Sequence, residues 1–482
     1  MPKSYKPYHI IIFVVACLIL LGVVVQLVPS GRKDILGYEF RFLSQNKLLK
    51  LKQRHEVNIS DVIADVDTTM IEIEEEEIIE NDSIKEKRKN YHINESDLLS
   101  YDDSGKKNLI AFFKKLKNIS DGKMRILHYG DSQIEGDRMT AFIRQRLQSQ
   151  FGGSGPGFIP AINVYNTITF VQEYSPNFQR FTNFGGKSLN TNRYGILNSV
   201  GRFTAEIPDS ISRDSLEMQT GWISIEPGRM AYSRAKYYNS IDLHYADAKD
   251  KCILRIYKNE ELVKTDSLKN DGKYHVYSYN TANDPQNIRF EFESKVSPNI
   301  LGFSLDGTHG VQVDNIAMRG SSGTFFGKID QNLAKRIYEN QKVELFIMQF
   351  GGNSMPYVKD SIGSDRAVSY FKGQLQTIKR LKPDAAIIVI GPSDMSTLIE
   401  GEYMTYPMLP YYVESMKKAT KEIGGAYFDT YAAMGGEDSM VAWVESGLAG
   451  TDYIHFTNKG SSIAAQKFYD ALMTVYNRLM KE

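Results

Sequence analysis

The chain has 482 residues, enough for two or three domains with complete cores, and its 42% hydrophobic and 24% charged content excludes wholesale disorder. Lysine plus arginine and aspartate plus glutamate are equal at 58 each, so no global charge favours nucleic acid as a partner. The two cysteines can build neither a disulfide framework nor a cysteine-based zinc cluster.

The amino-terminal segment is apolar from residue 10 to residue 28, interrupted by a single glutamine. About 20 residues of helix cross the hydrocarbon core of a bilayer. Lys3 and Lys6 precede the segment, which fits an amino terminus on the inside of the cell. We therefore predict that residues 1–30 form a single-pass transmembrane anchor and that the rest of the chain is exported to the periplasm or beyond. A cleaved signal peptide is the alternative, disfavoured by the length of the run and the missing Ala-x-Ala end.

Residues 31–104 show no stable domain pattern. An acidic stretch at 71–80 is followed by a basic stretch at 85–89. Charge blocks of this kind are typical of a solvated spacer. We predict a charged spacer here and assign no site to it.

An ordered pattern begins with apolar residues at helical spacing over 106–117, followed by a strand over 124–128. The strand stops at Gly130-Asp131-Ser132, and a second helix is predicted over 138–150. This is a helix–strand–helix unit of a parallel sheet. A strand-to-helix turn exposes a hydroxyl at the carboxyl edge of the sheet, beside backbone N–H groups, and this geometry suits Ser132 as a nucleophile.

Between residues 164 and 305 the pattern changes to short alternating runs separated by turn residues. This pattern predicts an inserted antiparallel β-sandwich. Tyrosines of this region could form a platform for sugars, but alternating aromatic residues in strands are more often core. The tyrosines in question are Tyr237, Tyr238, Tyr245 and Tyr257.

The α/β pattern returns after the insertion, with strands predicted over 311–320, 343–349 and 385–390 and helices over 327–339 and 366–381. Each strand ends in glycine or a small polar residue, at the edge where open α/β sheets place ligands.

Asp452 and His455 follow just before a long amphipathic helix that starts near residue 458. At this spacing the carboxylate can hold the imidazole in the tautomer that leaves its other nitrogen free as a base.

Four blocks in this chain order resemble the motifs of the SGNH (GDSL-like) hydrolase family: Gly130-Asp131-Ser132, Gly320, Gly351-x-Asn353 and Asp452-x-x-His455. The resemblance implies a flavodoxin-like three-layer αβα sandwich with a parallel sheet. The SGNH domain would comprise residues 105–163 and 306–482, with the β-sandwich at 164–305 inserted between its two parts.

By the same resemblance Ser132 is the nucleophile, His455 the base and Asp452 the residue that orients it. The oxyanion hole would be formed by the N–H groups of Ser132 and Gly320 and by the side-chain amide of Asn353. The chain departs from the founding signature at residue 133, where glutamine replaces leucine, and after Asn353, where serine stands in place of a frequent aspartate.

An exported SGNH core with an inserted sandwich is similar to bacterial enzymes that remove O-acetyl groups from peptidoglycan or other envelope polysaccharides. The predicted partners are therefore an acylated polysaccharide and the membrane. A lipase, with residues 395–409 as an apolar lid, and a sugar O-acetyltransferase are alternatives with the same catalytic residues. A noncatalytic glycan-binding envelope protein is the alternative of another class, disfavoured by the intact Ser132, Asp452 and His455.

The eight histidines show no compact ligand spacing, so we predict neither a metal nor another cofactor. His128 is expected to be a strand residue with a satisfied imidazole. Asp394, at a predicted strand end, either contacts substrate or caps the next segment, and we leave it out of the catalytic set.

Overall fold

The computed structural model describes residues 7–27, 32–35, 38–41, 57, 59, 60, 62, 99–120, 122–208 and 210–481. The chain divides into two units, Met1–Val57 and Asn58–Glu482. The first contains helix α1 (Pro7–Leu27) and an antiparallel hairpin of β1 (Arg32–Ile35) and β2 (Tyr38–Arg41). Most of the predicted spacer at 31–104 lies outside the described residues.

Among the helices in the described part of the chain, none is long and apolar enough to cross a membrane. Residues 1–6 and 28–30 of the predicted anchor lie outside the described residues. The anchor therefore stays a prediction.

The second unit is built on a five-stranded sheet with the order β15-β3-β16-β17-β20. Every neighbouring pair is parallel. The strands are β3 (Lys123–Gly130), β15 (Gly310–Ala317), β16 (Val343–Gln349), β17 (Ala386–Ile390) and β20 (Ala426–Phe428). Apolar runs make these strands because both faces of the sheet are covered. The predicted parallel α/β sheet is confirmed.

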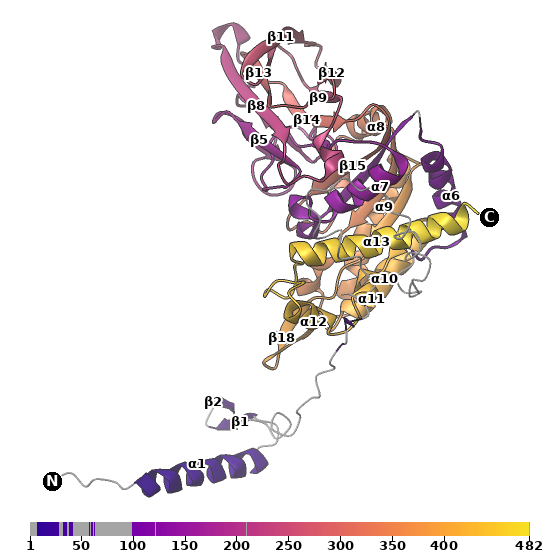
Figure 1. Cartoon of the computed structure of the whole chain (residues 1–482). Coiled ribbons are helices and arrows are strands. Elements are labelled where there is room, and N and C mark those ends of the chain that lie inside the picture. The colour runs from indigo at the N-terminus through magenta and orange to yellow at the C-terminus, as the bar shows by residue number, and fades with distance from the viewer. Residues whose placement is uncertain are drawn as a thin grey trace, which may run out of the picture. The chain divides into compact units, whose positions relative to one another are not determined.

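Alternating side chains of β3 reach the two faces of this sheet. Leu127 and Tyr129 belong to a buried cluster that includes Leu333, Leu375 and other residues of α8 (Gln331–Asn340), α9 (Ser361–Leu381) and α10 (Leu409–Glu422). The opposite face is covered by α6 (Asp103–Lys117), α7 (Thr140–Phe151) and α13 (Asn458–Leu479), and α7 and α13 lie side by side (Figure 1). The three layers are therefore helix, sheet and helix.

The antiparallel strands lie between α7 and β15 in the chain and form two sheets, ordered β11-β10-β13-β8-β5 and β12-β9-β14-β7-β6, with β4 also paired to β14. Their bounds are β4 (Gly157–Ile159), β5 (Phe170–Tyr174), β6 (Gln179–Thr182), β7 (Ser199–Arg202), β8 (Gln219–Pro227), β9 (Ser240–Ala246), β10 (Cys252–Lys258), β11 (Glu261–Leu268), β12 (His275–Asn280), β13 (Ile288–Ser294) and β14 (Asn299–Asp306). Both sheets contribute to one hydrophobic core, for example through Phe290 and Phe303, whose ring centroids are 5.2 Å apart. The antiparallel insertion is thus present, and its first strand begins at residue 157, before the predicted start at 164.

The tyrosines of the insertion divide between core and surface. Tyr238 and Tyr245 are buried in its core, as expected for alternating aromatic residues, whereas Tyr237 is exposed. None of them lines the two cavities described below.

A buried arginine joins the insertion to the parallel sheet. Arg125 on β3 forms ion pairs with Asp314 on β15, at 2.5 Å, and with Asp306 at the end of β14. Burying a guanidinium is tolerated only when its charge is compensated. These two carboxylates therefore hold the last strand of the insertion to the edge of the core sheet.

The remaining elements are short. They are the 3₁₀ turns η3 (Ser132–Asp137), η4 (Arg213–Ser215), η5 (Ser233–Lys236), η6 (Phe326–Lys328) and η7 (Gly352–Tyr357), helices α11 (Thr430–Ala433) and α12 (Ser439–Glu445), and the hairpin of β18 (Ser396–Ile399) and β19 (Glu402–Thr405). This hairpin occupies the segment predicted as a possible apolar lid.

Candidate active site

The site lies at the carboxyl ends of β3 and β16, in a cavity of about 190 Å³ lined by residues that follow several core strands. Ser132 is the first residue of η3, directly after the strand, and Asn353 lies in the turn after β16. Ile454 and His455 close the cavity from the loop before α13. Open α/β sheets bind ligands at this edge.

Ser132, His455 and Asp452 form a continuous hydrogen-bonded chain. Ser132 Oγ lies 2.7 Å from His455 Nε2, and His455 Nδ1 lies 2.7 Å from Asp452 Oδ2. A carboxylate at Nδ1 fixes the tautomer in which Nε2 accepts the serine proton. The three side chains have the arrangement of a serine nucleophile, its base and the group that orients the base.

The loop around Asp452 is folded around its carboxylate. Asp452 Oδ1 accepts hydrogen bonds from the backbone N–H groups of Ile454 and His455, both at 3.0 Å. Partial burial raises the pKa of Asp452, but these hydrogen bonds and the imidazole lower it more, and the net pKa is below its ordinary value. The carboxylate therefore stays charged beside the imidazole.

Gln133, the residue next to the serine, holds the same loop on both sides of His455. Its Nε2 donates to the carbonyl oxygen of Ile454 at 2.7 Å, and its Oε1 accepts from the N–H of Phe456 at 3.4 Å. Arg138 adds a second link, because it donates to the carbonyl oxygens of both Ser132 and Phe456. The sequence marked Gln133 only as a departure from the founding signature and gave no signal for Arg138.

The β18–β19 hairpin also contacts the loop that carries Asp452 and His455. The rings of Tyr403 and Tyr453 stack with centroids 3.7 Å apart and planes 12° apart. Tyr453 has a φ of +57°, a left-handed conformation that is costly for an aromatic residue and must be held by its surroundings. Its carbonyl oxygen also accepts from the N–H of Ser396 at 3.0 Å. The hairpin thus fixes the loop that carries Asp452 and His455.

The Asn353 side chain is engaged by two acceptors. Its Nδ2 donates to Asp131 Oδ2 and to the carbonyl oxygen of Ser321, both at 3.1 Å. An amide nitrogen has two N–H donors, so both are used in this arrangement. For Asn353 to donate to the oxyanion of a bound substrate, one of these two N–H groups must leave its present acceptor and turn toward that oxyanion.

Asp131 is buried and is one of the residues that line the cavity. It also accepts from the N–H of Gln133 at 3.0 Å, capping η3. Burial raises its pKa to about 6, against the lowering effect of its hydrogen bonds and of His455. Its contact with Asn353, 222 residues away in the sequence, became visible only in the fold.

Gly320 lies in the turn that follows β15, with a φ of +75° that favours glycine. Gly320 is not among the described residues that line the cavity containing Ser132. Its N–H as an oxyanion donor therefore stays a prediction.

Two other polar residues have structural roles. His128 is buried on β3, bonded to Gln349 at 3.0 Å and Thr140 at 2.9 Å, and burial lowers its pKa to about 3. It is a satisfied strand residue, as predicted. Asp394 is buried and accepts from Thr405 Oγ1 and the N–H of Met440, both at 2.7 Å, so it holds neighbouring segments together.

Within the described part of the chain, no group of three or more histidine, cysteine, aspartate or glutamate residues is arranged to hold a metal ion.

The sequence matches no known family profile and no curated protein sequence. The fold is similar to that of a solved structure described as a peptidoglycan O-acetylesterase, with a TM-score of 0.61 and 18% sequence identity. That alignment covers 79% of this chain and 99% of the other. At this identity the likeness establishes the fold alone.

Two carbohydrate esterases align with much lower TM-scores. A family two enzyme from Clostridium thermocellum in complex with cellohexaose has a TM-score of 0.22 at 10% identity, covering 55% of this chain and 94% of that one. A family 2 enzyme with a carbohydrate-binding domain from Corynascus thermopiles has a TM-score of 0.25 at 10% identity, covering 55% and 97%. Neither score establishes a common fold.

Proposed function

We propose that this protein is a serine esterase of the SGNH type that removes O-acetyl groups from peptidoglycan or another envelope or extracellular polysaccharide. The observation that carries the proposal is the chain of two 2.7 Å contacts from Ser132 through His455 to Asp452, at the wall of a cavity. The substrate class is supported by the likeness in fold to a structure described as a peptidoglycan O-acetylesterase.

The first half of the reaction transfers the acetyl group to the enzyme. Ser132 Oγ attacks the carbonyl carbon of the ester while His455 Nε2 takes the hydroxyl proton. The tetrahedral intermediate then collapses, the bond to the sugar oxygen breaks, and His455 returns the proton to that oxygen. The products are a free sugar hydroxyl and acetyl-Ser132.

The second half regenerates the enzyme. Water attacks the acetyl carbonyl carbon as His455 takes one of its protons. The second intermediate then collapses, the bond to Ser132 Oγ breaks, and His455 returns the proton to that oxygen. Acetic acid is released and ionises to acetate. Charged Asp452 stabilises the imidazolium that forms in both halves. The side chain of His455 is only partly buried, with 35% of it accessible, which gives water a route to the base.

The developing negative charge needs donors on the other side of the ester. We assign this role to the N–H groups of Ser132 and Gly320 and to the Asn353 amide. Asn353 must release its bond to Asp131 or to the Ser321 carbonyl, and catalytic hydrogen bonds often become well aligned only once the substrate is bound.

Acetate release should be measured from O-acetylated peptidoglycan, acetylated glucomannan and a chromogenic acetate ester, with the wild type and Ser132→Ala. Release from a polymer that requires Ser132 supports the proposal. Turnover of long-chain esters alone would indicate a lipase, and acetyl transfer to an added sugar acceptor would indicate a transferase. A folded wild type that binds the polymers but turns over none of the substrates would refute catalysis.

We further propose that residues 1–30 anchor the chain in a membrane and that the catalytic unit lies outside the cytoplasm. The apolar run over 10–28 supports this proposal. The full chain should remain with membranes after alkaline extraction, and added protease should reach residues 100–482 in spheroplasts. Release by alkali, or protection from the protease, would contradict it.

A further inference from the structure

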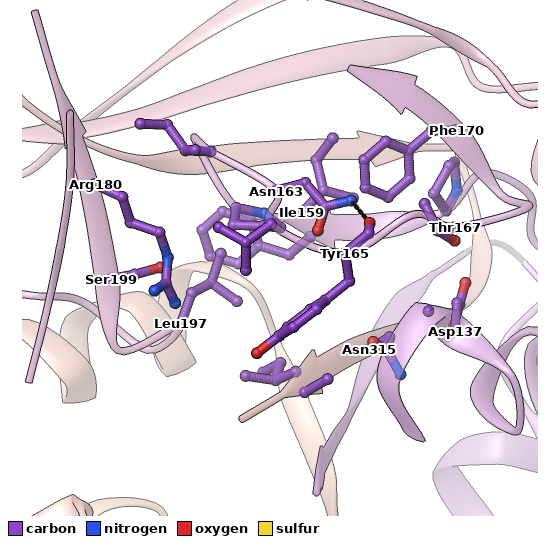
Figure 2. A pocket seen from close by; sticks show the side chains of 18 of the residues that line it. Asp137, Ile159, Asn163, Tyr165, Thr167, Phe170, Arg180, Leu197, Ser199 and Asn315 are labelled. Carbon is purple, nitrogen blue, oxygen red and sulfur yellow. Dashed lines mark hydrogen bonds between the residues drawn. The ribbon is translucent and has the colours of Figure 1, made fainter. Parts of the chain in front are cut away.

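A second cavity, of about 60 Å³, lies between the inserted sandwich and the edge strand of the core sheet. Its walls come from β4, β6 and β7 of the insertion and from η3 and β15 of the core. The side chains of Arg180 and Tyr165 extend into it (Figure 2). A binding site between two domains is a common location for ligands.

Residues of the cavity wall are close to Ser132 in the sequence. Gly136, on its wall, is four residues from Ser132, so their Cα atoms are at most about 15 Å apart. Ala317, which also lines the cavity, precedes the turn that contains Gly320. The guanidinium of Arg319 in that turn lies over the Tyr165 ring at 5.4 Å and pairs with Glu135 at 2.6 Å. One polymer chain could therefore occupy both cavities.

Two arginines line the cavity, and their surroundings differ. Arg144 pairs with Asp137 at 2.6 Å and also donates to the carbonyl oxygen of Val313. Asp137 accepts a further bond from Thr169 Oγ1, so its charge is fully engaged. This pair leaves no net charge for a ligand.

The side chain of Arg180, in contrast, has no hydrogen bond or ion pair with any residue that the structure describes, and its Nε is buried without a partner. Its Cζ lies 5.8 Å from the centroid of the Phe184 ring. Burial lowers its pKa and only Tyr165 among charged or titratable groups opposes this effect, yet an arginine stays charged in proteins. A half-buried cation without a counter-ion favours an anionic ligand, and a guanidinium suits a carboxylate.

We propose that this cavity is a subsite for a carboxylate carried by the polysaccharide, bound by Arg180 while a neighbouring acetylated sugar occupies the site at Ser132. The carboxylate can belong to a uronic acid or to the lactyl ether of a peptidoglycan sugar that carries no stem peptide. The inference rests on the proposed esterase function and adds to it a preference for acidic polymers.

The test compares wild type, Arg180→Gln and Arg180→Lys on three polymers: O-acetylated peptidoglycan strands freed of their stem peptides, an O-acetylated polyuronate and acetylated glucomannan, which is neutral. Arg229→Gln is the matched control, because it removes an exposed charge from the turn after β8. For Arg180→Gln we expect the ratio of kcat/KM between acidic and neutral polymers to fall about tenfold or more, through a higher KM on the acidic ones. Arg180→Lys should retain part of the preference, and Arg229→Gln should leave the ratio as in the wild type.

The two acidic polymers distinguish a uronate from a lactyl carboxylate. If kcat/KM of Arg180→Gln falls equally on acidic and neutral polymers, or on neither, the ratio is unchanged and the subsite is overturned. If the wild type turns over no ester, the esterase proposal fails separately. Calorimetry then decides the subsite, using the Ser132→Ala protein with an acidic oligosaccharide and with its carboxamide. Weaker binding of the carboxamide supports the subsite, and equal binding refutes it.

Discussion

The side-chain amide of Asn353 donates to the carboxylate of Asp131 at 3.1 Å, and Asp131 is the residue directly before Ser132. The same carboxylate caps η3 through the N–H of Gln133. One buried aspartate therefore contacts both the turn that presents Ser132 and the side-chain amide of Asn353.

Asn353→Ala should lower kcat for acetate esters on the order of 10²-fold, because a donor used only in the transition state is removed. KM should change much less. Steady-state kinetics on a chromogenic acetate ester measure both constants. Asn353→Asp, which keeps the size of the side chain but lacks its N–H donors, should be impaired at least as much. An unchanged kcat in either variant would remove Asn353 from the mechanism.

Asp131 should make the folded protein less stable as the pH rises from about 4 to about 6. Its carboxyl group is protonated in both states at low pH, and it keeps its proton longer in the folded state, where its pKa is about 6 in place of 3.8. Above this range the folded state carries a buried charge, at a cost of about 3 kcal/mol. The free energy of unfolding, measured with denaturant at pH 4 and at pH 7.5, should decrease less between these two values in Asp131→Asn than in the wild type. An equal decrease of this free energy in both proteins would show that Asp131 is not the source of the pH dependence.

Gln133→Ala should lower kcat about tenfold, because the two bonds that hold the loop on either side of His455 are lost. Gln133→Glu keeps the acceptor for Phe456 but loses the donor to Ile454, so it should retain part of the activity at most. A decrease in thermal stability without a change in kcat would assign Gln133 a purely structural role.

Tyr403→Ala should lower kcat about two- to tenfold by removing the ring that stacks on Tyr453. Tyr403→Phe keeps the stacking and is the matched control, with activity near that of the wild type. Imidazole NMR signals of His455 provide a second readout, since they should broaden in Tyr403→Ala alone. Equal kinetics and equal spectra in the two variants would show that the hairpin does not position this loop.

The core strands and the main helices could be predicted from the sequence because their apolar periodicity is strong and local. The strand β20 has only three residues, and the β18–β19 hairpin lies in a stretch read as a possible lid. Neither gives a clear periodic signal.

The candidate site was predictable where its residues share a motif, as Asp452 and His455 do. Gln133 and Arg138 contact the loop before α13, more than 300 residues away in the sequence. Their local sequence does not predict these contacts. Arg180 is a similar case, because its lack of a partner depends on how the insertion meets the core. Such features follow from tertiary packing and not from local propensity.

The most direct test of the central claim is mass spectrometry of the protein quenched during turnover of a chromogenic acetate ester. We expect an acetyl group on the peptide that contains Ser132 in the wild type, and neither acetylation nor turnover in a folded Ser132→Ala variant. Turnover that persists in Ser132→Ala, or acetylation at another residue that accounts for it, would contradict the assignment of Ser132 as the nucleophile.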